Sequence, residues 1–364
     1  MRLIFTGGGT LGSVMPLLAV LEELKTRDPG LDFLWVGTKR GPEKEIIEAR
    51  GVRFRSVIST KWRRYFDLRN IFVPFFIKAA FWQSFFILRR ERPAIVVSAG
   101  GFVGLPLIWA AWCLKIPVLI HQEDAVPGLA NRLAAPFTKK ITVVFGESAG
   151  VYPQKKTIVL GNPVRPEIFS AGGGPASGGD YNLDEARAFF HLEPGLPTIF
   201  VIGGGTGSAF LNHLVWENLE ELTNFCQIIH GTGKGKSVPS ISGNRRYHQY
   251  EILIAEYPDA LAVADLVVSR AGMGALSEFA ALGKSLLLIP LPGHQEVNAK
   301  ILADQGAAVV LHQPDATGRR FAAEVKNLLE APDKLREIAE KIHTAIKTDV
   351  RAAMADLILE VARG

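Results

Sequence analysis

Two glycine-rich segments of similar composition occur in the two halves of the chain, Thr6–Ser13 (TGGGTLGS) and Ile202–Ser208 (IGGGTGS). Each follows an apolar run with the composition of a β-strand. Glycines let a strand turn sharply into a helix, whose first N–H groups and positive dipole end can then bind an anion. We therefore expect phosphate or diphosphate at these segments. Neither ends in Gly-Lys-Ser/Thr, which argues against a P-loop ATPase. The second segment lacks GxGxxG spacing, so we do not expect a dinucleotide-dependent dehydrogenase.

The elements that must position these segments alternate between strand-like and helix-like patterns. Short apolar runs are separated by helix-length segments, which is typical of β/α units with a parallel sheet. In the first half we predict strands at Leu3–Phe5, Phe33–Val36, Ile95–Ser98, Val118–His121 and Ile141–Phe145, and helices such as Pro16–Arg27 and Leu105–Leu114. In the second half we predict strands at Thr198–Ile202, Cys226–His230, Leu253–Ala255, Leu266–Ser269 and Leu286–Pro290, and helices such as Gly274–Leu282. The predicted fold class is α/β, with two Rossmann-like parallel-sheet domains.

Length and cysteine content fit two domains in a reducing compartment. A chain of 364 residues is too long for one typical core and suits two. The most linker-like stretch is Ala171–Asp180, which we expect to be a surface loop near a hinge. Cys113 and Cys226 lie far apart in apolar segments, so we expect buried thiols without a disulfide. The sequence holds no Asp-X-Asp motif and no His/Cys cluster with ligand spacing, so we predict neither an obligate metal nor a cofactor.

The charge is distributed unevenly between the two halves. The formal net charge is +5, but residues 1–165 hold 24 Lys/Arg and 12 Asp/Glu, whereas the remainder holds 17 and 24. The bases do not form a recognition helix or an aromatic-interleaved sheet, so we predict no nucleic-acid partner. An anionic membrane surface fits the basic first half better.

One basic and aromatic segment, Lys61–Arg92, makes the membrane prediction more specific. It is interrupted by Pro74 and by polar residues such as Lys78, which leaves fewer than the roughly 20 consecutive apolar residues that a membrane span needs. Binding in the membrane interface and packing inside the first domain both remain open, because periodicity does not separate them. The aromatic residues we predict to contact the membrane are Trp62, Phe75, Phe76 and Trp82. Leu3–Phe5 leads directly into the glycine segment, so we expect no cleavable signal peptide.

Motifs spread over nearly the whole chain carry a family resemblance. They are Thr6–Pro16, Gly37-Thr38 with Gly41 and Glu43, Ser98–Phe102, His121–Arg132, Gly161–Arg165, the second glycine segment, Ala264–Glu278 and His294–Ala299. With these motifs the chain resembles the MurG family of peptidoglycan glycosyltransferases, in glycosyltransferase family 28. The resemblance implies transfer of N-acetylglucosamine from UDP-N-acetylglucosamine (UDP-GlcNAc) to the muramoyl 4-hydroxyl of lipid I, an undecaprenyl-diphosphate-linked acceptor, forming lipid II.

The resemblance also implies an architecture and a location. The expected GT-B fold has two Rossmann-like domains facing a cleft: residues 1–165 for the acceptor and the membrane, joined by a C-terminal helix at about 345–364, and residues 166–344 for the donor. The expected location is peripheral, on the cytoplasmic face of the bacterial cell membrane. Other cell-wall synthesis proteins are further expected partners.

Site residues follow from the matching motif positions. Glu278 is implied to bind the ribose hydroxyls, and Ile254 to meet the uracil through its backbone. The implied donor-binding set is Thr10, Gly12, Arg165, Gly204, Gly205, Thr206, Gly207, Ser208, Ile254, Glu278, Gln295 and Asn298. The implied acceptor-binding set is Gly8, Gly9, Gly100, Gly101 and Asn131. Glu278 as a plain helix-surface carboxylate and Arg165 as a domain-junction ion pair are the structural alternatives.

The chain departs from the family at the position expected to hold the base. Where the family has GGH-X-X-P, this chain has Ser13, and the family's HEQN is His121-Gln122-Glu123-Asp124 here. Serine is not a base at neutral pH, whereas an inverting transfer needs a proton acceptor. We hypothesise that Asp124, or second to it Glu123, is the base and that Ser13 helps to position the acceptor diphosphate. The alternative is that Asp124 only caps a loop before Pro127.

Three other functions stay open. A UDP-sugar 2-epimerase shares the fold and a UDP site, but has no need of the basic aromatic segment or of residues 121–132. A catalytically silent UDP-GlcNAc-binding protein is compatible with the loss of histidine at position 13. A related transferase with another lipid-linked acceptor is the nearest alternative among enzymes.

Overall fold

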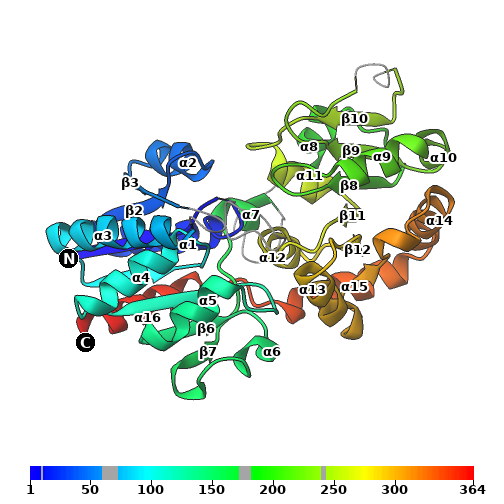
Figure 1. Cartoon of the computed structure of the whole chain (residues 1–364). Helices are drawn as coiled ribbons and strands as arrows, with labels where there is room; N and C mark the ends of the chain where they lie inside the picture. The colour runs from blue at the N-terminus through cyan, green and yellow to red at the C-terminus, as the bar shows by residue number, and fades with distance from the viewer. Residues whose placement is uncertain (10, 60–72, 172–181, 239–242) are drawn as a thin grey trace. The chain divides into compact units, whose positions relative to one another are not determined.

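The computed structural model describes residues 1–9, 11–59, 73–171, 182–238 and 243–364. The chain divides into two compact units (Figure 1). Unit 1 comprises Met1–Arg165 and Thr348–Gly364, and unit 2 comprises Pro166–Lys347. The chain therefore passes from one unit to the other twice, next to Arg165 and next to Thr348.

Unit 1 is built on a parallel sheet with the strand order β3-β2-β1-β4-β5-β6-β7. Its strands are β1 (Arg2–Thr6), β2 (Asp32–Thr38), β3 (Arg53–Val57), β4 (Ile95–Ser98), β5 (Val118–Gln122), β6 (Lys140–Val143) and β7 (Thr157–Val159). Its helices are α1 (Met15–Arg27), α2 (Glu43–Ala49), α3 (Val73–Glu91), α4 (Gly104–Cys113), α5 (Leu129–Ala134), α6 (Gly146–Ala149) and α16 (Arg351–Arg363).

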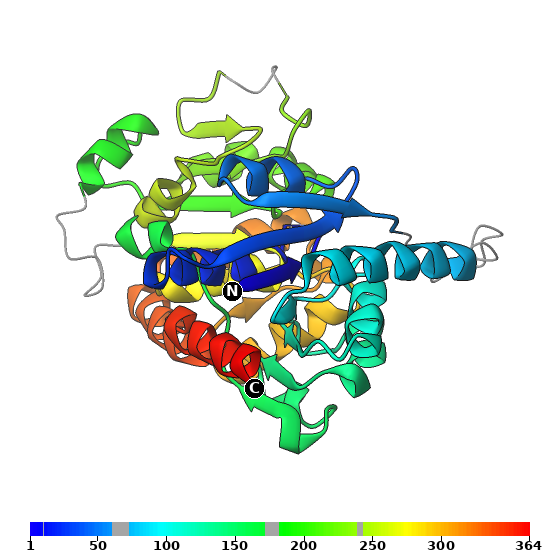
Figure 2. The same ribbon diagram turned by 90° about the vertical axis from the view of Figure 1, so that its left-hand side faces the viewer.

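Alternation along the central strand explains why helices cover both faces of this sheet. Leu3 and Phe5 pack into one core with α1 and α16, whereas Ile4 packs into the core beneath α3 and α4. Successive strand residues point to opposite faces, so a strand buried on both sides reads as a continuous apolar run. Helix α16 runs beside α1 (Figure 2), and its Asp356 pairs with Arg27 at 2.6 Å.

Unit 2 repeats the plan with the strand order β10-β9-β8-β11-β12-β13. Its strands are β8 (Thr198–Ile202), β9 (Gln227–Gly231), β10 (Tyr247–Tyr250), β11 (Leu266–Ser269), β12 (Leu286–Leu288) and β13 (Val309–Val310). Its helices are α7 (Pro166–Ala171), α8 (Leu183–Phe189), α9 (Ala209–Glu217), α10 (Leu219–Thr223), α11 (Tyr257–Val263), α12 (Met273–Ala281), α13 (His294–Asp304), α14 (Gly318–Leu329) and α15 (Pro332–Ala345). Ile199 and Val201 pack with α9 and α14, and Phe200 packs on Tyr257 of α11.

Two predictions about these elements were wrong. The strand expected at Leu253–Ala255 lies earlier, at Tyr247–Tyr250, and residues 251–256 form no strand. An edge strand with one neighbour needs less apolar character than a central one, so the apolar run misled the assignment. Cys113 is exposed at the end of α4, whereas Cys226 is buried and burial raises its pKa to about 12. The predicted linker Ala171–Asp180 lies outside the described residues except at its first position.

Candidate active site

Three loops of unit 1 meet at one edge of its sheet. Strands β1, β4 and β5 are neighbours and parallel, so the segments after them emerge at the same edge. These segments hold Gly7–Ser13, Gly100–Gly101 and Glu123–Asp124. A Cβ added at Gly101 would lie 3.5 Å from the Gly8 carbonyl oxygen, which shows how closely the first two loops approach. The topology therefore gathers the predicted acceptor and catalytic segments of unit 1.

The first glycine loop, residues Gly7–Ser13, is held from one side by β2. The Trp35 indole Nε1 donates to the Gly7 carbonyl at 3.0 Å. A side chain added at Gly12 would meet nothing within 4 Å, so the loop is open at that point. Ser13 is half-buried just before α1. Thr10 lies outside the described residues.

Asn131 on α5 projects next to the loop after β4. Its Nδ2 donates to Gln122 Oε1 at 2.7 Å, and its Oδ1 would lie 2.8 Å from a Cβ at Gly100. Gly100 has φ +92°, so a side chain there would be strained as well as crowded. Asn131 Oδ1 is buried and accepts no hydrogen bond from the residues that the structure describes. A buried acceptor of this kind is a natural place for a ligand hydroxyl.

His121 has a structural role at this edge of the sheet. It is fully buried, with Nδ1 2.9 Å from Thr142 Oγ1 and Nε2 2.9 Å from Asn162 Oδ1. Burial lowers its pKa to about 4, so the ring is neutral at pH 7. Through these two hydrogen bonds His121 connects β5, β6 and the segment after β7.

The adjacent carboxyl groups of Glu123 and Asp124 differ in environment. Glu123 is 9% exposed, and burial, together with the negative charge of Asp124, raises its pKa well above its usual value. Asp124 is half-buried, and its backbone carbonyl accepts hydrogen bonds from Gln122 Nε2 at 2.7 Å and Ser148 Oγ at 3.3 Å. Glu123 is thus the more buried of the two neighbouring carboxyl groups, and different environments suit them to different roles.

In unit 2, the second glycine loop, residues Gly203–Ser208, leads into α9. Ser208 caps that helix, since its Oγ accepts from Leu211 N at 3.2 Å. Gly207 has φ +69° and packs against the backbone of Thr232 and Gly233, which leaves no room for a side chain. The loop thus presents the start of a nine-residue helix at the carboxyl end of β8, where an anion is favoured.

Two cations that sequence reasoning did not assign hold this loop. Arg270, just after β11, donates from Nε and Nη2 to Ser208 Oγ at 2.9 and 2.6 Å. Partial burial lowers its pKa from the usual arginine value, but the guanidinium stays charged at pH 7. Lys236 Nζ donates to the Thr206 carbonyl at 2.9 Å. Arg270 belongs to the motif Ala264–Glu278, and its position directly after the predicted strand Leu266–Ser269 could have indicated this role.

The other predicted donor residues of unit 2 lie on α12, on α13 and after β10. Asn298 is fully buried and donates to the Ala271 carbonyl at 3.1 Å, and Gln295 Oε1 accepts from Leu291 N at 3.1 Å. Glu278 is half-buried on α12, and Ile254 is 75% exposed. Parallel strands β8, β11 and β12 bring the starts of α9, α12 and α13 to one edge of this sheet. Arg165 is the last residue of the first stretch of unit 1.

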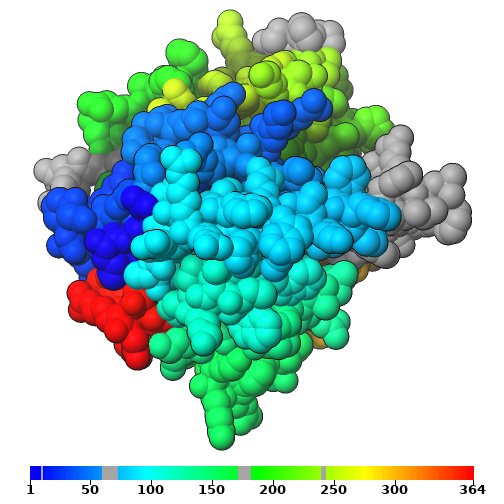
Figure 3. All heavy atoms as spheres, turned by 60° about the vertical axis from the view of Figure 1, so that its left-hand side comes forward, coloured from blue at the N-terminus to red at the C-terminus, as the bar shows by residue number. Residues whose placement is uncertain are grey.

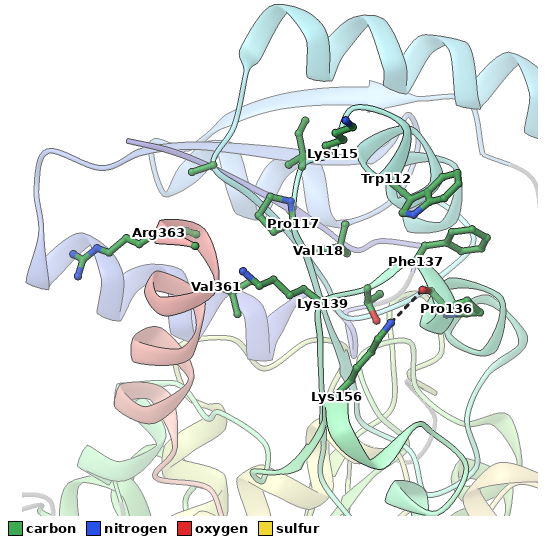
Figure 4. Close-up of a pocket in the computed structure, with 15 residues that line it drawn as sticks. Trp112, Lys115, Pro117, Val118, Pro136, Phe137, Lys139, Lys156, Val361 and Arg363 are labelled. Carbon is green, nitrogen blue, oxygen red and sulfur yellow. Dashed lines mark hydrogen bonds between the residues drawn. The ribbon is translucent and has the colours of Figure 1, made fainter.

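A pocket of about 580 Å³ lies at the opposite, amino-terminal edge of the unit 1 sheet (Figure 4). Its lining includes Trp112, Lys115, Lys139 and Lys156, and Lys156 Nζ donates to the Pro136 carbonyl at 3.2 Å. None of the predicted site residues that the structure describes lines it. This pocket is therefore separate from the candidate active site. Among the described residues, no group of three or more His, Cys, Asp or Glu side chains could hold a metal ion.

Helix α3 lies at the surface of unit 1 (Figure 3), and four of its aromatic side chains are exposed. The exposed fractions are 70% for Phe75, 48% for Phe76, 48% for Trp82 and 63% for Phe86. Ala80, Ser84 and Leu88 are buried on the inner side of the helix. No helix in the described ranges is both long enough and apolar enough to span a bilayer. Trp62 lies outside the described residues.

Comparison with known proteins identifies the class to which this fold and these loops belong. Residues 3–143 match the glycosyltransferase family 28 N-terminal domain, and residues 198–355 match the family 28 C-terminal domain. The chain therefore belongs to glycosyltransferase family 28.

Its relatives include curated proteins named UDP-N-acetylglucosamine–N-acetylmuramyl-(pentapeptide) pyrophosphoryl-undecaprenol N-acetylglucosamine transferase. One from Bacillus cereus is 37% identical over 351 residues, covering 95% of this chain and 94% of the relative. One from Geobacillus kaustophilus is 37% identical over 346 residues, covering 93% and 94%.

Solved structures share the fold. The chain is similar to MurG from Acinetobacter baumannii, with a TM-score of 0.74, 23% identity and 99% of each chain covered. It is also similar to a UDP-GlcNAc 2-epimerase from Neisseria meningitidis bound to UDP-GlcNAc, with a TM-score of 0.69, 14% identity and 99% and 100% covered. The architecture is accordingly GT-B, with two parallel-sheet α/β domains.

Proposed function

We propose that this glycosyltransferase moves N-acetylglucosamine from UDP-GlcNAc to the muramoyl 4-hydroxyl of lipid I, forming lipid II. The observation that carries the proposal is the second glycine loop, which leads into the start of α9 and is held by Arg270. The curated relatives of this chain are named for such a transfer. A sugar nucleotide presents a diphosphate, which such a loop is suited to bind. The solved epimerase is 14% identical to this chain, whereas the curated relatives named as transferases are 37% identical. We therefore favour a transferase over an isomerase.

The donor is assigned mainly to unit 2. The amides of Gly204–Ser208 and the Arg270 guanidinium provide donors and positive charge for the diphosphate. Glu278 accepts hydrogen bonds from the ribose hydroxyls, and the backbone at the exposed Ile254 meets the uracil. The remaining assigned donor residues are Thr10, Gly12, Arg165, Gln295 and Asn298.

The acceptor is assigned to the gathered loops of unit 1. Gly8 and Gly9 lie on the first glycine loop, and Gly100 and Gly101 lie on the loop that touches it. Asn131 offers its buried Oδ1 atom, which has no hydrogen-bond partner within the described ranges, to an acceptor hydroxyl or amide. Glycines allow a bulky diphosphate-linked sugar to approach the backbone closely.

We assign the proton transfer to Asp124. The acceptor 4-hydroxyl oxygen attacks the anomeric carbon, the bond from that carbon to the UDP oxygen breaks, and the configuration inverts. The hydroxyl proton passes to the Asp124 carboxylate. Burial raises the pKa of the neighbouring Glu123, which favours its neutral form, and Ser13 positions the acceptor diphosphate. The negative charge that develops on UDP is stabilised by loop amides and Arg270.

Membrane contact is assigned to α3. Its exposed aromatics would lie in the interface, and the excess of Lys and Arg in residues 1–165 would favour an anionic surface. The enzyme would then work as a peripheral protein on the cytoplasmic face of the bacterial membrane, where a lipid-linked acceptor is accessible.

The transfer is tested with purified protein, radiolabelled UDP-GlcNAc and a short-chain lipid I analogue in the presence of EDTA. We expect label in the lipid product and one equivalent of released UDP. Labelled donor bound without product, with other lipid-linked acceptors also inactive, would overturn the proposal and indicate a UDP-GlcNAc-binding protein. Loss of activity in EDTA that Mg²⁺ restores would contradict the metal-independent mechanism.

A further inference from the structure

We propose that Glu43 is the positioning residue of the first glycine loop, fixing the backbone that receives the acceptor. This inference rests on the proposed function, because it takes its meaning from what that loop binds. Glu43 belongs to α2, outside the loop itself, and is fully buried. Buried carboxylates are costly unless hydrogen bonds compensate for the lost water.

The Glu43 carboxylate joins the loop to the end of β2. Its Oε1 accepts from Thr38 N at 2.7 Å and from Thr38 Oγ1 at 2.6 Å. Its Oε2 accepts from Gly9 N at 3.2 Å. The two oxygens thus hold different segments, and the bond to Gly9 fixes a residue whose φ is +82°.

Glycines surround this carboxylate on both segments. A Cβ added at Gly8, at Gly37 or at Gly41 would collide with Glu43 oxygens or come within van der Waals contact of them. The backbone of the loop therefore lies directly on the carboxylate. This close approach explains the glycine at position 8, whose φ does not require one.

The pattern of partners requires an acid rather than an amide. All three partner groups are donors, so both oxygens must accept. A glutamine has one oxygen and one NH₂ group. If its oxygen keeps the two Thr38 bonds, its NH₂ group opposes the Gly9 N–H, and the loop loses its attachment.

The consequence is larger for one substrate than for the other. The direction of the amides in Gly7–Ser13 depends on the loop conformation, and we assign the acceptor to that loop. The second glycine loop lies in the other unit and makes its own bonds to Arg270 and Lys236. Only Thr10 and Gly12 of the assigned donor residues lie on the first loop. Loss of the Glu43 carboxylate should therefore impair use of the acceptor more than it impairs donor binding.

The test compares Glu43→Gln with Glu45→Gln, an exposed glutamate on the same helix. For Glu43→Gln we expect kcat/KM for the lipid I analogue to fall about tenfold or more, as for loss of a hydrogen bond to a charged group. The UDP-GlcNAc Kd should change by a smaller factor than the acceptor kcat/KM, because most of the assigned donor residues lie outside the first loop. Amide hydrogen exchange in the peptide spanning 7–15 should quicken, and Glu45→Gln should match the wild type in every measurement.

Three outcomes would overturn the proposal: unchanged loop exchange, unchanged acceptor kinetics, or an equal loss of donor affinity. If Glu43→Gln does not fold, Thr38→Val is the second variant, because it removes one donor to Oε1 and retains Gly9. It should reduce acceptor kcat/KM by less than the tenfold expected for loss of the whole carboxylate, and Thr38→Ser should restore it. Unchanged acceptor kcat/KM in Thr38→Val would then overturn the proposal. Loop exchange is measured without substrate, so a wild-type protein with no transfer activity contradicts the proposed function but not the role of Glu43 in the loop.

Discussion

Arg270 and Ser208 come from different β/α units of the same domain, and the arginine donates two hydrogen bonds to the serine hydroxyl at 2.9 and 2.6 Å. The same hydroxyl caps α9 through Leu211 N. One oxygen therefore ties the end of β11 to the start of the helix that faces the proposed diphosphate. Changes at either residue should affect donor binding before they affect the rest of the fold.

We predict that Arg270→Lys weakens UDP binding by about tenfold, because a lysine lacks the planar fork that reaches the serine through two nitrogens. Isothermal titration with UDP measures this, with the exposed Arg319→Lys as the matched control. Ser208→Ala should lower stability by about 1 kcal/mol through the lost cap. Wild-type UDP affinity in Arg270→Lys would show that the Arg270–Ser208 pair does not shape the donor site.

Asp124→Asn should lower kcat by about 10²- to 10⁴-fold, the range typical for loss of a general base. The asparagine preserves shape and cannot take the proton, so Kd for UDP-GlcNAc should not change. Single-turnover transfer to the lipid I analogue is the measurement, and the exposed Glu147→Gln is the control. Near-normal turnover in Asp124→Asn would remove this residue from the proton-transfer step.

Stability should fall as the pH drops from 7 to 5. Burial lowers the pKa of His121 to about 4 and that of His230 to about 3, so both stay neutral in the folded chain at pH 5. In the unfolded chain they take up protons near pH 6.5, and each should cost about 2 kcal/mol of unfolding free energy by pH 5. Urea unfolding at the two pH values tests this. Because Glu123 changes stability in the opposite direction, the comparison is made in Glu123→Gln, and equal stability of this variant at pH 5 and pH 7 would contradict neutral buried histidines.

The Glu123 carboxyl gives the opposite pH dependence. Because its pKa is raised in the folded state, its contribution to stability is full below the ordinary glutamate pKa and is lost as the pH rises above it. Glu123→Gln imitates the protonated form. Its stability relative to the wild type should therefore increase between pH 4 and pH 7, as measured by urea unfolding, and a pH-independent difference would argue for an ionised Glu123.

Substitution of the exposed aromatics of α3 should weaken binding to anionic vesicles. Each buried aromatic contributes about 1.5 to 3 kcal/mol, so Phe75→Ser should reduce partitioning by about tenfold or more. Ile252→Ser, at an exposed apolar residue of unit 2, is the control. Co-sedimentation with vesicles that contain phosphatidylglycerol measures the effect, and equal partitioning of both variants would place the membrane contact elsewhere.

The central strands could be predicted because a strand that is buried on both faces has a continuous run of apolar residues. Ile95–Ser98, Thr198–Ile202 and Leu266–Ser269 were predicted with the bounds that the structure has. Edge strands were missed or displaced, since β3 mixes Arg53 and Arg55 with apolar residues and β13 has two residues. Their pairing depends on a neighbour distant in sequence rather than on local pattern.

The two glycine loops were also predicted, because a glycine-rich segment directly after an apolar run indicates a sharp turn at the end of a strand. The groups that hold those loops were not. Glu43 and Arg270 act across strands, through hydrogen bonds to residues 34 and 62 positions away. A single sequence gives the residue types at these positions, and only the folded chain brings each of them to its partner.

The double crossing between units has a consequence for biosynthesis. Unit 2 is one continuous stretch, Pro166–Lys347, whereas the unit 1 core includes Met354 and Ile358 of α16. Most of unit 1 is therefore synthesised first, but its core is completed last, because α16 follows the whole of unit 2 in the chain. Until α16 is in place, the part of this core that Met354 and Ile358 cover is exposed, so a nascent or truncated chain presents an apolar surface that chaperones and proteases can recognise.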